Sequence, residues 1–315
     1  MSRKMNSRTD TRRFRAGLFI LAAPVILLAH LGSTTSPQTV LQRPSANLQI
    51  KNLVALETAK AVAWAKAVEV AGPGISMGEP ILCSNGHNEI NTYMFVFRIG
   101  TPIFPTDEEI LYTVQKGIAY EEALDRGETP EELKALIDPN EIYSRLADIK
   151  TSIIRSGGQS TGMYQSIERE EIRKRALKIR FGIDDYLTIY VSASYENFPI
   201  PRYKKSLPIY YTAYEKARDE AGKALGSQSI LLAKYYFLGM RGEYFEFTNS
   251  ERTVIYDAVK NKMIADEERL LRPKLASLRP AMLGQELILI TDAVRQEWQN
   301  AIAKTVGQKP GKGGL

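Results

Sequence analysis

A ten-residue stretch with apolar side chains on both of its faces constrains the fold of this chain more than any other feature. Residues 90–99 (INTYMFVFRI) are dense in the aromatic and β-branched side chains that favour strands. Both alternating faces are apolar over residues 94–97. A strand of this kind needs cover on both faces and a neighbour on each edge, so we expect it inside a sheet rather than at its rim.

The segments before this strand predict how its sheet is built. Residues 80–83 are a short apolar run, and the Asn-Gly pair within residues 84–88 predicts the turn of a hairpin. Residues 55–70 are rich in alanine, the best helix former, and Pro73-Gly74 stops the helix. The small alanine side chains indicate that this helix packs closely on the sheet.

The second half of the chain repeats this order of elements with low identity between the copies. An alternating strand is expected at residues 186–194 and an alanine-bearing helix at 211–225. An aromatic hairpin follows at 229–240 and 243–248. We therefore predict an α+β fold with two modules, each a helix on an antiparallel sheet, joined by a helical segment and followed by C-terminal helices.

Charge, proline and glycine content set the expected boundaries. The predicted parts are a first α+β module at residues 47–117, a charged helical connector at 118–182, a second module with C-terminal helices at 183–306, and a disordered tail at 307–315. In the connector, Thr129 and Glu132 have the spacing of a capping box, and residues 164–180 form a charged helix. C-terminal helices are expected at 253–271 and 285–306.

The N-terminal segment has the composition of a secretory signal. Residues 1–15 carry six Lys or Arg and one acid, and residues 16–31 carry no formal charge at neutral pH. Residues 1–32 are therefore interpreted as a signal peptide or a retained membrane anchor, and residues 33–46 as a polar linker. Basic flanks favour the cytoplasmic side, which places the body outside the cytoplasm: periplasmic, extracellular or anchored to the membrane.

The net charge of +6 does not indicate nucleic-acid binding, because the excess lies at the two ends. Residues 1–15 carry +5, and residues 304–315 carry +3. The remaining body has 33 basic and 35 acidic residues, a net charge of −2. Binding to a phosphate backbone requires cations clustered on the folded surface, so no nucleic-acid partner is expected.

The chain contains no set of residues that is typical of a catalytic or metal site, and we expect no cofactor. Cys83 and His87 flank one hairpin turn, whereas nucleophile and base in thiol enzymes come together from distant segments. Cys83 is interpreted as a small buried hydrophobic residue, with a reactive thiol as the alternative. Asp184-Asp185 is typical of a solvated turn, with a hard-cation site as the alternative.

An aromatic and proline-rich loop is the candidate for binding a partner. Aromatic side chains presented together with prolines can form a hydrophobic contact surface for another protein. The alternative is that the same rings pack back onto the sheet. The candidate partner-binding residues are Tyr195, Phe198, Pro199, Tyr203 and Tyr210.

One family resemblance arises from the helix LETAKAVAWAKAV and the following strand pair GEPILCSNGHNEINTYMFVF. This pattern resembles the propeptide-type inhibitor domains of streptopain-type secreted cysteine proteases and, more loosely, PepSY-type domains. It covers about a third of the chain, counting a divergent second copy at residues 210–256. The resemblance implies one helix on an antiparallel sheet and a binding or inhibitory role. It carries over no catalytic residues, because no protease domain follows.

These observations favour an exported, non-enzymatic binding or inhibitor-like protein of the cell envelope, with a protein partner there and membrane contact through the N-terminal segment. Two alternatives remain open. One is a structural envelope component that assembles through strand edges. The other is a hydrolase whose carboxylates converge from distant segments, since isolated acids leave no local pattern. The sequence carries no signal for an oligomeric state.

Overall fold

The fold was analysed in a computed structural model. The residues that it describes are 53–85, 89–136, 144, 147–148, 151, 161–239, 242–264 and 285–306. The predicted leader, linker and C-terminal tail lie outside these residues. Among the described residues, no helix combines the length and the apolar content that crossing a membrane requires.

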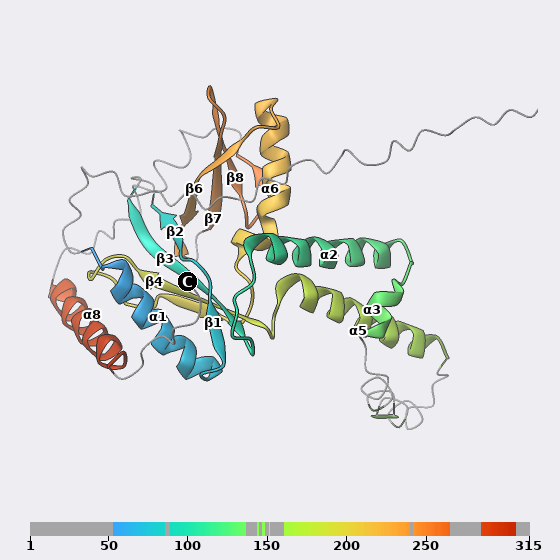
Figure 1. The fold of residues 1–315 in the computed structure, drawn as a ribbon, viewed down its shortest axis with the longest axis horizontal. Coiled ribbons are helices and arrows are strands. Elements are labelled where there is room, and N and C mark those ends of the chain that lie inside the picture. Colours follow the sequence, from blue (N-terminus) through green and yellow to red (C-terminus); the bar gives the residue numbers. More distant parts are fainter. Residues whose placement is uncertain are drawn as a thin grey trace, which may run out of the picture. The chain divides into compact units, whose positions relative to one another are not determined.

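The α+β class is confirmed: the protein combines helices with a single, mostly antiparallel sheet of nine strands (Figure 1). The strands are β1 (Ile75–Met77), β2 (Ile81–Ser84), β3 (Ile90–Ile99), β4 (Tyr186–Ser192), β5 (Arg202–Lys204), β6 (Leu231–Phe237), β7 (Glu243–Thr248), β8 (Thr253–Asp257) and β9 (Lys262–Met263). Their order is β5-β4-β3-β2-β6-β7-β8-β9, and β1 also pairs with β3. The helices are α1 (Leu56–Ala71), α2 (Asp107–Asp125), α3 (Glu131–Ala135), α5 (Thr161–Phe181), α6 (Ile209–Leu225) and α8 (Gln285–Ala303). Of these, α2, α3 and α5 project from one side of the sheet (Figure 1).

The strand at 90–99 has the predicted bounds and an interior position between β4 on one edge and β1 and β2 on the other. Its two apolar faces enter two different cores. Phe95 and Phe97 pack with α1, and Met94 and Val96 pack with residues of α2 and α6. These four side chains are at most 1% exposed.

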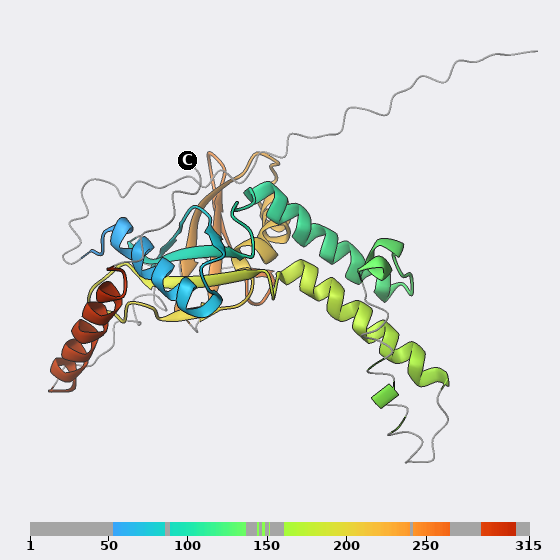
Figure 2. The same cartoon turned by 60° about the horizontal axis from the view of Figure 1, so that its bottom comes forward.

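Helix α1 lies close on the sheet because alanines form its inner face. Its buried residues are Ala59, Val62, Ala63, Ala65 and Ala67. The helix ends at Gly72, whose φ of 81° lies in the region that favours glycine, and whose N–H donates to the Val68 carbonyl. Helix α8 lies beside α1 (Figure 2) and contributes the buried Val294 and Trp298 to the same core.

The second half places its helix on the opposite face of the sheet. α6 packs on β7 and β8, and its core contains the face of β3 that points away from α1. β2 and β6 are the inner strands of the two halves, and they run parallel through one bridge, Ser84 to Tyr236. The hairpins β2-β3 and β6-β7 extend from these two strands in opposite directions along the sheet, and the helices of the two halves cover opposite faces.

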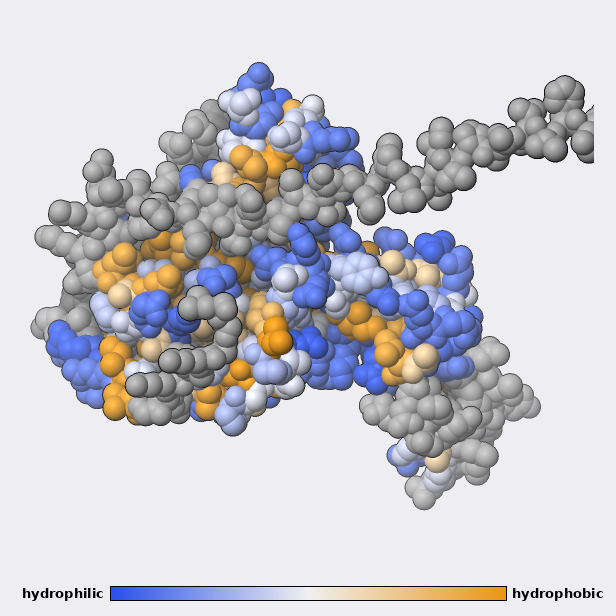
Figure 3. All heavy atoms as spheres, in the orientation of Figure 1, coloured by the Kyte–Doolittle hydropathy of each residue, from blue (hydrophilic) through white to orange (hydrophobic). Residues whose placement is uncertain are grey.

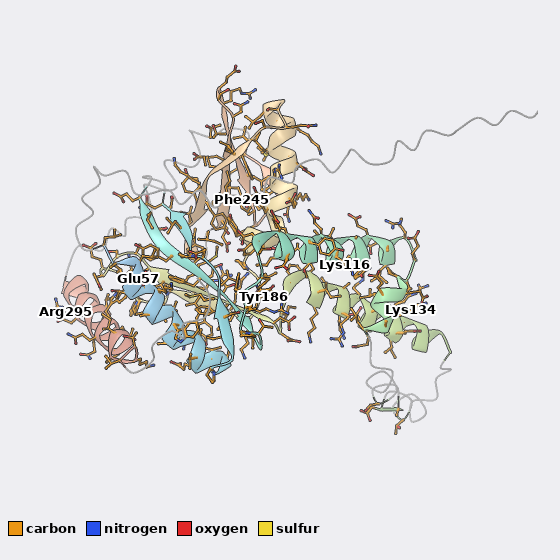
Figure 4. The ribbon with its side chains drawn as sticks, in the orientation of Figure 1. Glu57, Lys116, Lys134, Tyr186, Phe245 and Arg295 are labelled. Atoms are coloured by element: carbon orange, nitrogen blue, oxygen red, sulfur yellow. The ribbon has the colours of Figure 1, made fainter. Side chains whose placement is uncertain are left out.

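Phe245 shows how the second core is filled. It is fully buried, and its ring lies within 6.0 Å, centroid to centroid, of four other aromatic rings, those of Tyr210, Tyr214, Tyr235 and Phe247 (Figure 4). Such packing buries large apolar area and adds favourable ring-edge contacts. The aromatic hairpin that the sequence predicts therefore has a core role in this half.

Helices α2 and α5, which include the two ends of the predicted connector, pack against each other. Gly117 of α2 meets the backbone of Arg180 of α5 so closely that a Cβ there would lie 2.7 Å from the Arg180 Cα. The Arg180 guanidinium donates to Glu121 at 2.6 Å. The capping box in this region is formed by Thr106 and Glu109 at the start of α2, and the one predicted at Thr129 is wrong: α3 begins after Pro130 with no side-chain cap.

The helix predicted at 253–271 is also wrong over its described part. Residues 253–257 form strand β8, paired with β7, and 262–263 form β9. The Asn249 side chain accepts from the N–H groups of Glu251 and Arg252, which closes the turn between β7 and β8. Val254 and Tyr256 then reach the α6 core on alternate positions. Pairing with β7 and burial of alternate side chains fix residues 253–257 as a strand.

Candidate partner-binding groove

A groove with a volume of about 370 Å³ lies between α1, the loop before β5, and α8. The loop, residues 195–201, leads into β5 and carries most of the predicted partner-binding residues. Its side chains in the groove wall are Phe198, Pro199, Ile200 and Pro201, followed by Tyr203 of β5. Helix α1, helix α8 and the residue directly after α8 supply charged and small residues to the other walls: Val62, Lys66 and Glu69, then Glu297 and Ala301, then Lys304.

Hydrogen bonds from β4 and from α8 hold the backbone of the loop in place. The Ser192 N–H donates to the Pro199 carbonyl at 3.0 Å, and Pro199 itself is buried. On the other side, the Trp298 indole N–H donates to the Asn197 carbonyl at 2.8 Å. The Tyr195 ring meets the Trp298 ring edge-on, with centroids 4.9 Å apart. The loop therefore presents its aromatic rings from a fixed backbone.

Three aromatic side chains of this region remain substantially in solvent. The exposed fractions are 50% for Phe198, 48% for Tyr203 and 38% for Tyr195. Large rings are the residues that contribute most to protein interfaces, since each can bury a large area at low entropic cost. Figure 3 shows apolar and polar surface interspersed on the face it displays, so hydrophobic exposure is not confined to one continuous patch there. These three rings differ from other exposed apolar side chains because a fixed backbone holds them beside a groove.

The charges of the groove are arranged around Glu69. Its carboxylate contacts Lys66 at 2.6 Å and Lys304 at 3.1 Å, and these two hydrogen bonds lower the pKa of Glu69. The Lys66 ammonium also lies over the Tyr203 ring, 4.9 Å from its centroid. Glu69 thereby links α1 to the residue that follows α8, and two ammonium groups share one exposed carboxylate in the groove wall.

Strand β5 connects the groove to a buried polar cluster on the other face of the sheet. Tyr203 faces α1, whereas Arg202 and Lys204 point to the opposite side, as alternate strand residues must. Glu243, 1% exposed, accepts from Arg202 at 3.4 Å and from the Tyr235 hydroxyl. Burial lowers the pKa of Lys204. Side chains on opposite faces of one short strand thus contribute to the groove wall and to this cluster.

Cys83 borders the same cluster and is not arranged as a nucleophile. It is fully buried, and its thiol donates to the Ile81 carbonyl at 3.7 Å. Burial, with a smaller effect of the Glu243 carboxylate, raises the pKa of the thiol well above its ordinary value. A thiolate is therefore strongly disfavoured at neutral pH, in agreement with the structural interpretation. His87 lies outside the described residues.

The buried carboxylates do not form a catalytic pair. Glu243 lies on the face of the α6 core, whereas Asp257 pairs with Tyr244 on the opposite face. Asp257 accepts from the N–H groups of Val259 and Lys260, which is a turn-closing role. In the part of the chain that the structure describes, no group of three or more His, Cys, Asp or Glu side chains could hold a metal ion.

The structure brings four of the five predicted residues together and separates the fifth. Tyr195 and Phe198 are exposed beside the groove, Pro199 supports the loop, and Tyr203 forms a wall. Tyr210 lies instead at the start of α6, 2% exposed, within the aromatic core around Phe245. It is removed from the surface because α6 needs an apolar inner face where it meets the sheet.

Nothing in the local sequence indicates which residues hold this loop. Trp298 stands on the predicted apolar face of the C-terminal helix, but no local pattern shows that its indole binds a loop a hundred residues away. Lys66 and Glu69 similarly look like ordinary exposed charges of an alanine helix. Comparison of the chain with protein-family models, with curated proteins and with solved structures finds no match.

Proposed function

We propose that this chain is an exported, non-enzymatic binding or inhibitor-like protein of the cell envelope, and that it holds a segment of a partner protein in the groove. The observation that carries the proposal is the set of half-exposed rings beside the groove, those of Tyr195 and Phe198 on the fixed loop and that of Tyr203 on β5. A rigid aromatic surface loses little conformational entropy on binding, so contact area converts efficiently into affinity.

The cellular placement rests on the N-terminal segment. Its cationic start and apolar run are typical of a signal peptide or anchor. A reporter fused after residue 46 tests this placement: we expect activity of a reporter that works only outside the cytoplasm, such as alkaline phosphatase. Activity of a cytoplasm-dependent reporter alone would contradict the envelope role.

Two other functions are less well supported. A hydrolase with dispersed carboxylates requires acids that converge, and Glu243 and Asp257 lie on opposite faces of the sheet. A structural component that assembles through strand edges predicts association of the chain with itself. That alternative is an outcome of the experiments below, since it would make self-association depend on concentration.

Site-specific photo-crosslinking in cells tests the binding surface. A benzophenone amino acid at position 198 should give a discrete adduct with a second protein, and the Tyr203→Ala change should abolish it. The matched control is the same group at Ile103, which is 78% exposed and lies outside the groove. Equal adducts from both positions, or an adduct that survives Tyr203→Ala, would remove the groove as the binding surface.

A further inference from the structure

Strand β5 ends the sheet and leaves one of its sides unpaired. It is the first strand in the sheet order, bonded only to β4 within the described residues. An unpaired strand edge presents N–H and C=O groups that can pair with another extended chain. Which groups point outward decides whether this edge can bind a peptide.

The hydrogen bonds around β4 determine that direction. The Ala193 N–H donates to the Asn91 carbonyl of the β3 side at 3.0 Å, and the Ile99 N–H donates to the Asp185 carbonyl at 2.7 Å. The backbone N–H and C=O groups of the odd-numbered residues of β4 therefore point toward β3, and those of the even-numbered residues point toward β5. The hydrogen bond from the Ser192 N–H to the Pro199 carbonyl agrees with this direction.

The register with β4 then orients the backbone of β5. Tyr190 pairs with Arg202 and Thr188 with Lys204, so these pairs exchange the hydrogen bonds between the strands. The N–H and C=O of Tyr203 consequently point away from the sheet. The same residue turns its ring toward the groove, beneath Lys66. A peptide that pairs with Tyr203 would place alternate side chains on the groove face.

A proline limits the number of residues in this edge that can pair with a peptide. Pro201 lies two residues before Tyr203, so its backbone faces the same side of the strand, but proline has no N–H. The outward donors of this stretch are therefore the N–H groups of Tyr203 and Lys205. A short edge next to proline resists general aggregation. It is still long enough to pair with two or three residues of a segment whose side chains also bind in the groove.

The charges near the edge select an acidic segment. Arg202, Lys204 and Lys205 follow one another around Tyr203, and Lys66 and Lys304 stand across the groove. The acids beside them are Glu243, which is buried on the far face, Glu69 and Glu297 of the groove, and Glu196 of the loop. Cations exceed acids in this set, so an acidic chain is attracted and a basic one repelled.

We propose that β5 accepts an extended acidic segment of a partner protein as an added strand. The segment pairs with the outward N–H and C=O of Tyr203 and inserts one apolar side chain between Phe198 and the α1 wall. This inference rests on the proposed binding role of the groove. It adds the backbone geometry and the charge of the partner, which the groove by itself does not specify.

The test uses the full chain and the synthetic peptide acetyl-Asp-Val-Asp-Val-Asp-Val-Asp-amide, which alternates acidic and apolar side chains. We expect saturable binding in a fluorescence titration, and slower hydrogen exchange at the Tyr203 amide when the peptide is bound. In an added strand, alternate N–H groups of the peptide point toward β5 and away from it. Two peptides are therefore compared, each N-methylated at one of two adjacent central residues. One change should weaken binding roughly three- to tenfold, and the other should leave binding unchanged. Because the peptide carries this change, a folding defect of the protein cannot produce the result.

Protein variants separate the backbone contact from the side-chain contact. Tyr203→Ala removes the ring and keeps the N–H, whereas Tyr203→Pro removes both. A further loss of affinity from Ala to Pro is expected, and Tyr112→Ala, which changes an exposed tyrosine elsewhere, should have no effect. The peptide with lysine in place of aspartate should bind at least about tenfold more weakly, because its charges are repelled.

Each contrary outcome overturns a defined part of the proposal. Unchanged exchange at Tyr203, or binding that tolerates both N-methylated peptides, would exclude strand addition and leave groove binding intact. Equal binding of the lysine peptide would exclude the acidic partner. A peptide that binds at Tyr203 while position 198 gives no adduct in cells would support the edge and remove the proposed function. Self-association blocked by Tyr203→Pro would assign the edge to a second copy of the chain instead.

Discussion

The two halves of the sheet each combine a helix with an antiparallel hairpin and differ in what covers them. In the first half, β3 has α1 and α8 on one face and residues of α2 and α6 on the other. In the second half, α6 covers one face, and the opposite face carries the smaller cluster of Tyr236, Tyr244 and Ile255. Repetition of a local pattern therefore does not reproduce its environment, because the two helices lie on different faces of the one sheet.

A cavity in the second core tests whether the two halves unfold together. Phe245→Ala should lower the free energy of unfolding by about 3–5 kcal/mol, since it removes a fully buried ring. Both tryptophans, Trp64 and Trp298, pack around α1 in the first half. Their fluorescence in a denaturant titration should show the same loss if the single sheet unfolds as one unit. A tryptophan transition that is unchanged by Phe245→Ala, while Phe95→Ala shifts it, would mean that the halves unfold separately.

A second experiment addresses the polar contact between the halves. Glu243→Ala leaves Arg202 and Tyr235 without their carboxylate, and should cost about 2–3 kcal/mol, less than a fully buried pair because Arg202 is partly solvated. Glu243→Gln should cost less, since its carbonyl still accepts. Glu251→Ala, at an exposed acid of the turn that follows the same strand, is the control. Thermal unfolding measures all three, and an equal effect of the two alanine changes would contradict the special role of Glu243.

A smaller effect is expected where the first half supports the groove. Trp298→Phe keeps a ring against Tyr195 but removes the bond to the Asn197 carbonyl. We expect a loss of about 1 kcal/mol in stability, and faster hydrogen exchange in residues 195–201. Trp64→Phe is the matched control. If exchange in the loop does not change, the indole bond is not what holds it.

The smallest expected effect is that of Glu69 on the pH dependence of stability. Its pKa is lower in the folded chain, so its contribution is complete above its ordinary value of 4.5 and is lost as the pH falls through the folded value. The side chain is 45% exposed, which limits the contribution to about 0.5 kcal/mol or less. Glu69→Gln should therefore lower the melting temperature slightly at pH 7 and not at pH 3. A larger difference at pH 3 would contradict this sign.

Local patterns predicted the elements whose own residues decide their structure. The strand at 90–99, the alanine helix before it and the helix at 211–225 agree with the structure to within two residues at each end. These segments have strong periodicity or propensity that agrees with their surroundings. The prediction failed at residues 253–263, where pairing with β7 decides the structure, and at Thr129, where a capping spacing occurs without a capping bond.

The sequence by itself determined that this chain is an α+β protein, that the 90–99 strand is interior, and that an aromatic loop precedes residue 203. Side-chain chemistry and its period of two or 3.6 residues are sufficient for those conclusions. Only the tertiary structure decided that Tyr203 lies at an open edge while Tyr210, seven residues later, lies in the core. The two tyrosines are chemically identical, and what separates them is which distant helix or strand occupies the space beside each ring.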